Sequence, residues 1–345
     1  MVIEVSDRVP SKTIRVTQFR RRSRVGGYSL ERLYDDIIEN LPSAFRITVR
    51  ENRFESTGVL RRLWDSFAAV LCQGDVNHVA GDVHFLTYFL SRRKTILTIL
   101  DCGILGDSQG VKRFLLWFLW FWLPVRRASR IVVISESTKR ELLKHVSCRL
   151  DKVRVIHCNV SDEFRPHPLR FNHVTPRLLQ IGTKPNKNVQ RLVAALAGLD
   201  CELIIVGALT VELRGVLIQH QIRFVNRVGL ARVDLLKEYQ SCDIVTFVST
   251  YEGFGLPIVE ANAVGRPVIA GNVHSMPEVA GDGACLVDPF DIESIRNGIE
   301  RVIKDHSYRD GLVDRGFRNA ERFRTAFIAN QYAELYREIF DGCEQ

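Results

Sequence analysis

Short apolar runs alternate with longer amphipathic segments along most of the chain. The runs have the length and the β-branched content of strands that are buried on both faces of a sheet. The segments between them are typical of helices. This alternation predicts the α/β class, with parallel sheets that helices cover on both faces. Strands are expected at residues 13–17, 45–50, 76–80, 94–100, 130–134 and 152–158, and then at 177–181, 201–206, 222–226, 243–248 and 267–270.

A proline-containing stretch, residues 160–176, separates two series of such units. Its three prolines are typical of an interdomain linker. A chain of 345 residues is long enough for two domains with cores of their own. We therefore expect an N-terminal domain over residues 1–165 and a C-terminal domain over residues 166–325.

Residues 249–261 form the most informative stretch, directly after a predicted strand. Pro257 suits the first turn of a helix, and Gly265 suits its end. The stretch is therefore predicted to be a glycine-bearing loop followed by a helix N-terminus. Such a loop presents unpaired backbone N–H groups and the positive end of a helix dipole, which together favour an anion.

Two carboxylates distinguish this loop from a simple phosphate loop. Glu252 lies in the loop and Glu260 about one turn into the helix. Neither suits a bare phosphate, but both can accept hydrogen bonds from sugar hydroxyls. A nucleotide-sugar, with phosphates between two sugars, would satisfy the amides and the carboxylates together. The alternative is an ordinary loop whose glutamates are solvated.

The two glutamates resemble the signature of the retaining glycosyltransferases of family 4, the "group 1" transferases. They are separated by seven residues within Tyr-Glu-Gly-Phe-Gly-Leu-Pro-Ile-Val-Glu-Ala, and the resemblance continues through residues 265–268, 276–281 and 286–289. It implies the GT-B fold, in which two Rossmann-like domains with parallel sheets face each other across a cleft. It also implies that the C-terminal helix, about 326–345, packs back on the N-terminal, acceptor-side domain.

The resemblance also implies a reaction and a set of site residues. The reaction is transfer of a sugar from a nucleotide-sugar to an acceptor hydroxyl with retention of configuration, in glycan, lipopolysaccharide or exopolysaccharide assembly. Glu252 and Lys187 are the implied catalytic residues. Glu252 would hold the transferred sugar, Lys187 the diphosphate and Glu260 the ribose. The implied donor-binding residues are Gly26, Gly27, Thr183, Lys187, Val228, Glu252, Gly253, Phe254, Gly255, Leu256 and Glu260.

Two positions depart from the family pattern. Many relatives have an arginine where this chain has Thr183, followed here by Lys184, and a histidine where it has Leu100. These departures leave a second interpretation open, a non-catalytic subunit that binds sugar nucleotides. Polar clusters at two predicted strand ends would face the cleft from the N-terminal domain. The acceptor-side candidates are His78, Asp82, His84 and Asp101, with a core or capping role as the alternative for the two histidines.

Other reactions are less compatible with the sequence. A nicotinamide-dependent Rossmann enzyme would need a Gly-x-Gly-x-x-Gly loop, which the chain lacks. Paired carboxylates for glycoside hydrolysis are not evident. We expect no cofactor and no metal, because no Asp-x-Asp motif is present and a lysine with helix termini can neutralise a diphosphate. A capping-box pattern at residues 138–141 predicts a further helix that begins there.

Charge and cysteine content restrict partners and compartment. The net charge of +8 and the isoelectric point near 9.2 indicate an anionic partner, such as a nucleotide or an anionic lipid. A nucleic acid is not expected, since no aromatic platform accompanies the charge. Eight scattered cysteines without a CxxC pair suggest reduced thiols and a cytoplasmic location, and the N-terminus lacks the pattern of a signal peptide.

Residues 112–127 form a tryptophan-rich apolar segment with basic ends. The apolar part, residues 114–125, is too short to span a bilayer as a helix. Its composition predicts an interfacial helix on an anionic membrane, which would place the protein peripherally on the inner face of the membrane. The alternative is a helix buried between the sheet and a neighbouring subunit.

Overall fold

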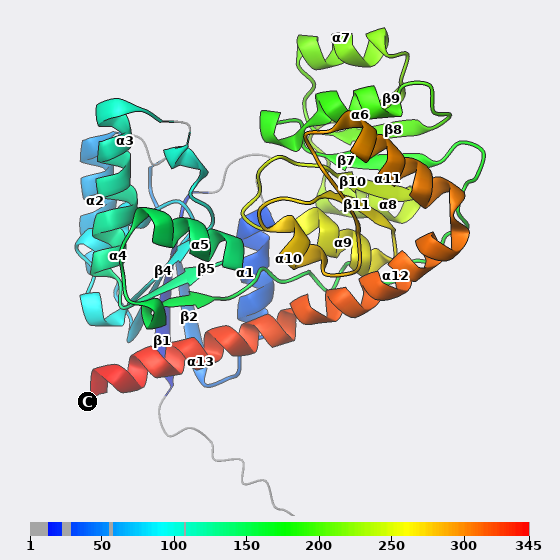
Figure 1. Cartoon of the computed structure of the whole chain (residues 1–345). Coiled ribbons are helices and arrows are strands. Elements are labelled where there is room, and N and C mark those ends of the chain that lie inside the picture. Colours follow the sequence, from blue (N-terminus) through cyan, green and yellow to red (C-terminus); the bar gives the residue numbers. More distant parts are fainter. Residues whose placement is uncertain (1–12, 23–28, 55–57, 107, 345) are drawn as a thin grey trace, which may run out of the picture.

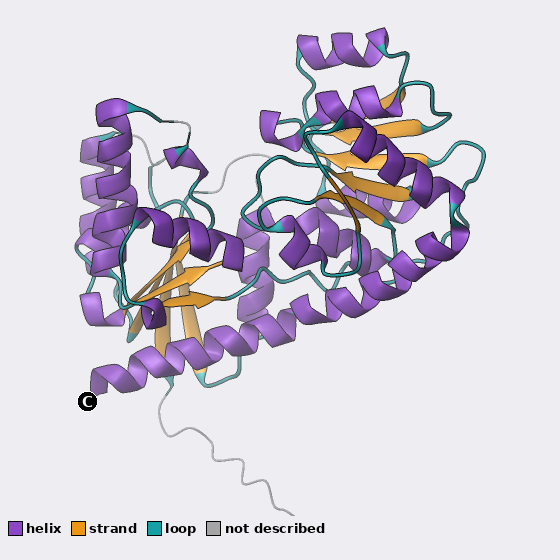
Figure 2. Ribbon diagram, viewed as in Figure 1, coloured by secondary structure: helices purple, strands orange, loops and turns teal. Residues whose placement is uncertain are grey.

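The computed structural model describes residues 13–22, 29–54, 58–106 and 108–344. Two lobes, each built on a six-stranded parallel sheet, lie side by side (Figure 1). Helices flank both sheets, as Figure 2 shows. The predicted α/β class with two Rossmann-like domains is therefore confirmed. Every strand expected from the apolar runs is present among the described residues. Most of the observed strand ends lie within one or two residues of the expected ones.

The first sheet has the strand order β2-β1-β3-β4-β5-β6. Strands β3 and β4 are buried at every position, because helices cover both faces. The strands are β1 (Ile14–Arg20), β2 (Phe45–Glu51), β3 (Val76–Ala80), β4 (Thr95–Ile99), β5 (Arg130–Val133) and β6 (Val153–Val155). The helices are α1 (Ser29–Glu39), α2 (Val59–Val70), α3 (Gly110–Leu116), the π-helical turn η4 (Trp117–Trp122), α4 (Leu123–Arg127) and α5 (Glu136–His145).

The second sheet has the strand order β12-β11-β10-β7-β8-β9. Apolar side chains form one core on each of its faces. The strands are β7 (Arg177–Ile181), β8 (Glu202–Val206), β9 (Arg223–Arg227), β10 (Ile244–Phe247), β11 (Val268–Gly271) and β12 (Cys285–Val287). The helices are α6 (Val189–Leu196), α7 (Val211–Gln219), α8 (Arg232–Ser241), α9 (Leu256–Val264), α10 (Met276–Ala280), α11 (Ile292–Lys304) and α12 (His306–Ala320).

The last helix, α13 (Thr325–Glu344), leaves the second lobe and runs under the first (Figure 1). Ile328, Tyr332, Leu335 and Ile339 recur at helical spacing and are buried in the core on one face of the first sheet. The C-terminal segment therefore completes the N-terminal domain. This packing ties the two lobes together at a point remote from the loops at the strand ends.

The tryptophan-rich segment is one continuous helical stretch formed by α3, η4 and α4. Its three tryptophans point inward and are half-buried. Trp117 donates from Nε1 to the carbonyl oxygen of His145 at 2.7 Å, and Trp122 stacks on Phe118 at 5.1 Å. Among the described residues no helix combines the length and the hydropathy that crossing a bilayer requires. None of the eight cysteines, all of which are described, forms a disulfide.

Candidate functional site

The glycine-bearing loop joins β10 to α9 at the carboxyl edge of the second sheet. Gly255 precedes the helix with a φ of 122°, a conformation that glycine adopts at little cost. Pro257 lies in the first turn, where its missing N–H costs no hydrogen bond. Gly265 ends the helix in the left-handed conformation. Residues 249–255, here called the Glu252 loop, therefore lead into a helix N-terminus.

Lys187 and Glu252 form an ion pair between the loops after β7 and β10. Nζ of Lys187 lies 2.6 Å from Oε1 of Glu252, and the two side chains are only 18% and 15% exposed. The ammonium lies 4.6 Å from the centroid of the Phe247 ring. The side chain of Lys187 lies over the backbone of Gly182. A Cβ at position 182 would lie 3.0 Å from Cε of Lys187, so glycine leaves room for the lysine. The pair is thus held in place and shielded from water.

Further hydrogen bonds hold the backbone of the Glu252 loop. Asn186 donates from Nδ2 to the carbonyl of Tyr251 at 2.9 Å and to Oε1 of Glu252 at 3.3 Å. Oγ of Ser275 lies 2.9 Å from the carbonyl oxygen of Glu252 and 2.6 Å from that of Phe254. The loop is therefore ordered by protein contacts alone, which is the preorganisation that electrostatic catalysis needs.

Glu260 lies on α9, one turn beyond its N-terminus. The hydroxyl of Tyr239 donates to Oε2 of Glu260 at 2.5 Å. Burial raises the pKa of Glu260, and the nearby charge of Lys187 opposes that shift. Tyr239 therefore satisfies one oxygen of this carboxylate and fixes its orientation.

The Glu252 loop also contacts the N-terminal domain. The carbonyl oxygen of Gly253 accepts hydrogen bonds from Oγ of Ser135 at 2.8 Å and from Oγ1 of Thr138 at 3.2 Å. A Cβ on Gly253 would lie 2.3 Å from the carbonyl oxygen of Leu100, a distance that no side chain tolerates. Glycine is therefore required at this position by the close approach of the two domains.

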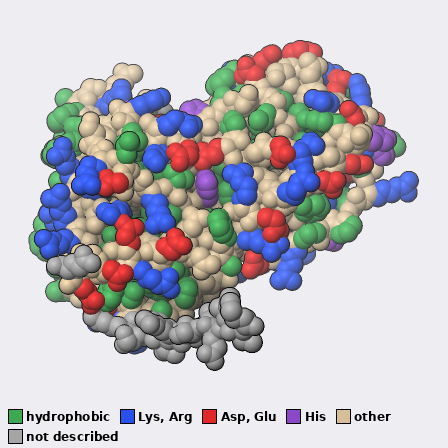
Figure 3. Space-filling view, turned by 60° about the horizontal axis from the view of Figure 1, so that its bottom comes forward, with side chains coloured by type: hydrophobic (Ala, Val, Ile, Leu, Met, Phe, Trp, Pro, Cys, Tyr) green, Lys and Arg blue, Asp and Glu red, His purple; other side chains and the backbone are tan. Residues whose placement is uncertain are grey.

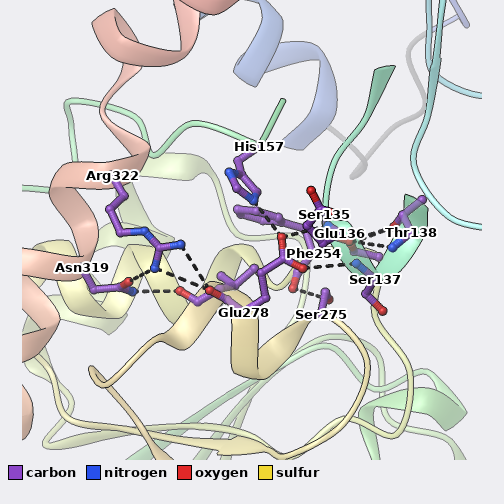
Figure 4. A network of polar contacts seen from close by, with 12 residues as sticks. Ser135, Glu136, Ser137, Thr138, His157, Phe254, Ser275, Glu278, Asn319 and Arg322 are labelled. Carbon is purple, nitrogen blue, oxygen red and sulfur yellow. Dashed lines mark hydrogen bonds and ion pairs between the residues drawn. The ribbon is translucent and has the colours of Figure 1, made fainter. Parts of the chain in front are cut away.

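Glu278 of α10 reaches the same part of the N-terminal domain, the first turn of α5 (Figure 4). Its Oε1 accepts hydrogen bonds from the N–H of Glu136 and from Nε2 of His157, both at 2.8 Å, and its Oε2 accepts from the N–H of Ser137 at 3.2 Å. Burial alone would raise the pKa of Glu278, but these hydrogen bonds hold it below its usual value. The carboxylate thus caps a helix of one domain from the other.

A cavity of 340 Å³ lies in the N-terminal domain next to this contact. Three predicted acceptor-side residues, Asp82, His84 and Asp101, line it. The cavity meets the Glu252 loop at Asp101. A Cβ on Gly253 of that loop would lie 3.2 Å from Cβ of Asp101. Burial raises the pKa of Asp101, and the charges of Asp82 and Glu252 add to the shift. The other lining residues are Arg21, Arg22, Arg62, Ile104, Leu116, Trp120 and Phe121.

His84 is a neutral histidine at the wall of this cavity. Its Nδ1 lies 2.7 Å from the carbonyl oxygen of Trp120. A carbonyl oxygen only accepts, so Nδ1 carries the proton and Nε2 is the accepting nitrogen. Burial lowers the pKa of His84, which keeps the ring uncharged. Nε2 is therefore a candidate acceptor for the hydrogen bond of a ligand hydroxyl.

The structure places His78 elsewhere, which corrects its assignment to the acceptor side. His78 is fully buried in β3, with Nε2 2.8 Å from Oγ1 of Thr98 and Nδ1 2.9 Å from the hydroxyl of Tyr336. Burial lowers the pKa of His78 to about 3. Since Tyr336 belongs to α13, this histidine joins the first sheet to the returning helix and is a core residue.

The remaining predicted donor-binding residues differ in their surroundings. Gly26 and Gly27 lie outside the described residues. Oγ1 of Thr183 donates to the carbonyl of Ala208 at 2.7 Å, so this hydroxyl orders the protein's own loops. Val228 is exposed in the turn after β9.

Two predicted donor-binding residues have apolar side chains in the Glu252 loop and its helix. Phe254 is buried, with ring centroids 5.9 Å from His157 and 5.5 Å from Phe323, so only its backbone is available to a ligand. Leu256 is half-buried at the start of α9.

Sequence reasoning missed several residues of the domain contact. The predicted helix start at residues 138–141 was late, because α5 begins at Glu136 and Ser135 is its N-cap, with Oγ accepting from the N–H of Thr138 at 3.0 Å. Ser135 directly follows the strand expected at residues 130–134 and lies three residues before Thr138, a spacing that indicates an N-cap. No local pattern marks Glu278 as a partner of this helix, since the two lie more than a hundred residues apart.

Comparison with known families covers almost the whole chain. A family model described as "Glycosyltransferase Family 4" matches residues 8–164, and one described as "Glycosyl transferases group 1" matches residues 166–318. A curated relative, the serotype-specific mannosyltransferase WbdA of Escherichia coli, is 26% identical over 243 residues, which are 64% of this chain and 30% of that protein. The chain therefore spans about a third of that relative's length.

Further relatives have similar folds or sequences. The MMP alpha-(1->4)-mannosyltransferase of Mycolicibacterium hassiacum is 29% identical over 229 residues, 62% of this chain and 55% of that protein. Sucrose-phosphate synthase from Thermosynechococcus elongatus superposes with a TM-score of 0.76 at 16% identity, covering 95% of this chain and 99% of that one. HepE of Anabaena, solved with UDP and glucose, superposes with a TM-score of 0.76 at 18% identity, covering 94% and 99%. These two structures establish the GT-B fold.

Proposed function

We propose that this chain, which belongs to the group 1 glycosyltransferases of family 4, transfers a sugar from a nucleotide-sugar to an acceptor hydroxyl. The observation that carries the proposal is the shielded ion pair of Lys187 and Glu252 at a helix N-terminus. This pair and the cavity of the other domain meet at the contact between Gly253 and Asp101. A donor on one side and an acceptor on the other would bring their reacting atoms together there.

The proposed reaction requires stabilisation of the negative charge on the leaving group more than covalent catalysis. The acceptor oxygen bonds to the anomeric carbon, the bond from that carbon to the diphosphate oxygen breaks, and the hydroxyl proton leaves with the nucleoside diphosphate. Lys187 and the N-terminus of α9 would stabilise the negative charge on the departing diphosphate. Glu252 would orient the transferred sugar and Glu260 the ribose. These groups replace a metal ion in the proposal, and transfer is proposed to retain the configuration.

The relatives suggest which substrates to test first. WbdA and the Mycolicibacterium enzyme are mannosyltransferases by name, and HepE was solved with UDP and glucose. We therefore propose a hexosyl donor, with GDP- and UDP-hexoses as first candidates. A sugar hydroxyl of a growing glycan is the proposed acceptor, in the assembly of a surface polysaccharide.

The proposal is tested by melting curves with UDP-, GDP-, ADP- and dTDP-sugars, followed by assays for nucleoside diphosphate release. One donor should raise the melting temperature, because a ligand at about a hundred times its Kd adds about 2.7 kcal/mol to the stability. The same donor should be hydrolysed slowly without an acceptor. A shift without any release would favour the non-catalytic subunit, and no shift with any donor would contradict both functions.

The predicted membrane contact is here proposed for other residues of the same region. The exposed apolar residues of this region lie on two helices, at helical spacing, and not at the tryptophans of η4. Arg62 of α2 lies 5.0 Å over the Trp120 ring, so the two helices are neighbours. We define the apolar face by its exposed members Leu60, Leu63, Trp64, Phe67 and Leu71 on or beside α2 and Val111, Phe114, Leu115 and Leu119 on α3 and η4.

We propose that this apolar face docks on an anionic membrane. Arg61, Lys112, Arg113 and Arg126 are exposed on the same helical segments, and basic side chains follow the outer edge of this lobe in Figure 3. An apolar surface of this kind marks an interaction site, and the basic residues favour an anionic partner. Docking would bring the neighbouring cavity close to a membrane-bound acceptor.

Serine substitutions test the membrane proposal. Trp64→Ser with Phe67→Ser, or Phe114→Ser with Leu115→Ser, should weaken binding to phosphatidylglycerol-containing liposomes at least about tenfold, since burying one large apolar side chain is worth about 1.5–3 kcal/mol. Co-sedimentation measures the binding. Ile218→Ser, on the exposed surface of α7, is the matched control. If the variants bind liposomes as the wild type does, and if the wild type forms dimers but the variants do not, the apolar face is a subunit interface.

A further inference from the structure

Three arginines gather at the cavity of the N-terminal domain. Arg21 and Arg22 follow strand β1, and Arg62 comes from α2. They converge although about 40 residues separate the two segments. The proposed transfer reaction at the Glu252 loop gives none of them a role. A cavity of 340 Å³ is within the range of about 300–1,000 Å³ that is common for small-molecule sites.

Neighbouring side chains hold two of the arginines in defined positions. Nε of Arg21 lies 3.0 Å from Oε1 of Glu31, and its Nη1 lies 3.6 Å from Oδ2 of Asp82. The guanidinium of Arg62 lies over the rings of Trp120 at 5.0 Å and Phe85 at 5.8 Å. A guanidinium that is fixed in this way loses little conformational freedom when it binds an oxyanion.

The third arginine has no carboxylate partner among the residues that the structure describes. Nη1 of Arg22 donates to the carbonyl oxygen of Arg53 at 3.4 Å, which is an uncharged partner. The cavity has two carboxylates of its own, Asp82 and Asp101. The three arginines outnumber these carboxylates in the lining of the cavity. The cavity therefore favours a ligand that brings negative charge.

The walls of the cavity also suit a sugar. Trp120 and Phe121 supply aromatic surface, and His84 and the two aspartates supply groups that bind hydroxyls. Planar guanidinium forks match the oxygens of a phosphate, to which they donate paired hydrogen bonds. Sugar and phosphate are thus accommodated by different parts of one cavity.

We infer that the acceptor of this transferase carries a phosphate next to its sugar, and that Arg21, Arg22 and Arg62 bind that phosphate. The inference rests on the proposed function, since it assigns the cavity to the acceptor. The phosphate can belong to a soluble sugar phosphate or to a lipid-linked one. The chemistry of recognition is the same in both cases, and the two are distinguished by experiment.

Calorimetry without donor tests the site directly. Mannose 1-phosphate and glucose 1-phosphate should bind the wild-type protein more tightly than the methyl glycosides of the same sugars. Arg22→Gln and Arg62→Gln should each reduce the affinity for the sugar phosphate about ten- to a hundredfold, the usual effect of losing a hydrogen bond between charged groups. Arg62→Lys, which keeps the charge but not the fork, should give a smaller loss. Arg214→Gln, exposed on α7, is the matched control.

Transfer assays then separate the sources of the phosphate. A polyprenyl-phosphate-linked sugar in detergent is compared with the soluble sugar phosphates as acceptor. The wild-type protein should prefer one of these two acceptors over the methyl glycosides, and this preference should fall in the arginine variants. Two results would overturn the inference and leave the transferase function intact. In the first, the methyl glycosides bind and react as well as the sugar phosphates. In the second, the arginine variants keep the wild-type preference for the sugar phosphates over the methyl glycosides. Arginine-dependent phosphate binding without any donor turnover would instead refute the proposed transfer, and with it the acceptor role of the ligand, while the phosphate site itself would remain.

Discussion

Lys187→Ala should lower kcat for transfer about a hundred- to a thousandfold. The ammonium lies in a shielded position 2.6 Å from Glu252, and Phe247 and Gly182 hold its side chain in place. A fixed cation at the departing diphosphate acts mainly in the transition state, and loss of one such donor costs about a hundred- to a thousandfold in other enzymes. The measurement is the rate of nucleoside diphosphate release at saturating donor and acceptor.

A matched control separates this effect from a general loss of charge. Lys237 is exposed on α8 and pairs with Asp234 on the same helix, so Lys237→Ala should leave the rate unchanged. Lys187→Ala leaves the partly buried Glu252 without its ion partner, which destabilises the loop as well. Rates are therefore compared on variants whose melting curves show a folded protein. A folded Lys187→Ala variant with the wild-type rate would remove this lysine from the mechanism.

Glu252→Gln and Glu260→Gln should affect different kinetic constants. Glu252 is proposed to contact the transferred sugar, whose charge and geometry change in the transition state, so its variant should lower kcat about ten- to a hundredfold. Glu260 is proposed to contact the ribose, which scarcely changes during transfer. Its variant should mainly raise the donor KM. Initial rates over a range of donor concentrations, at saturating acceptor, measure both.

Each glutamate has a structural contact that the comparison must control. Glu252 binds Lys187 and Asn186, whereas Glu260 accepts the hydroxyl of Tyr239. Tyr239→Phe removes the contact of Glu260 and keeps the carboxylate, so it should reproduce part of the KM effect. The opposite pattern, with kcat lost in Glu260→Gln and only KM changed in Glu252→Gln, would reverse the assignment of the two ends of the donor.

Much of the architecture follows from patterns that are local in the chain. Apolar runs of strand length predicted the two parallel sheets, because a strand that is covered on both faces needs apolar side chains throughout. The spacing of Glu252 and Glu260, with Pro257 and Gly265 around them, predicted the loop and helix that the structure contains. These features depend on residues that lie close together along the chain, so the sequence by itself determines them.

The contacts between distant segments were decided only by the tertiary structure. Glu278 caps α5 across 142 residues, and Gly253 is glycine because Leu100 of the other domain approaches it. His78 was placed at the acceptor side, but α13 buries it. The tryptophans of η4 point inward because the neighbouring sheet and helices cover them, which leaves the apolar face to other residues. Periodicity and motifs describe neighbours along the chain, whereas these residues acquire their partners only when the two domains and the last helix pack together.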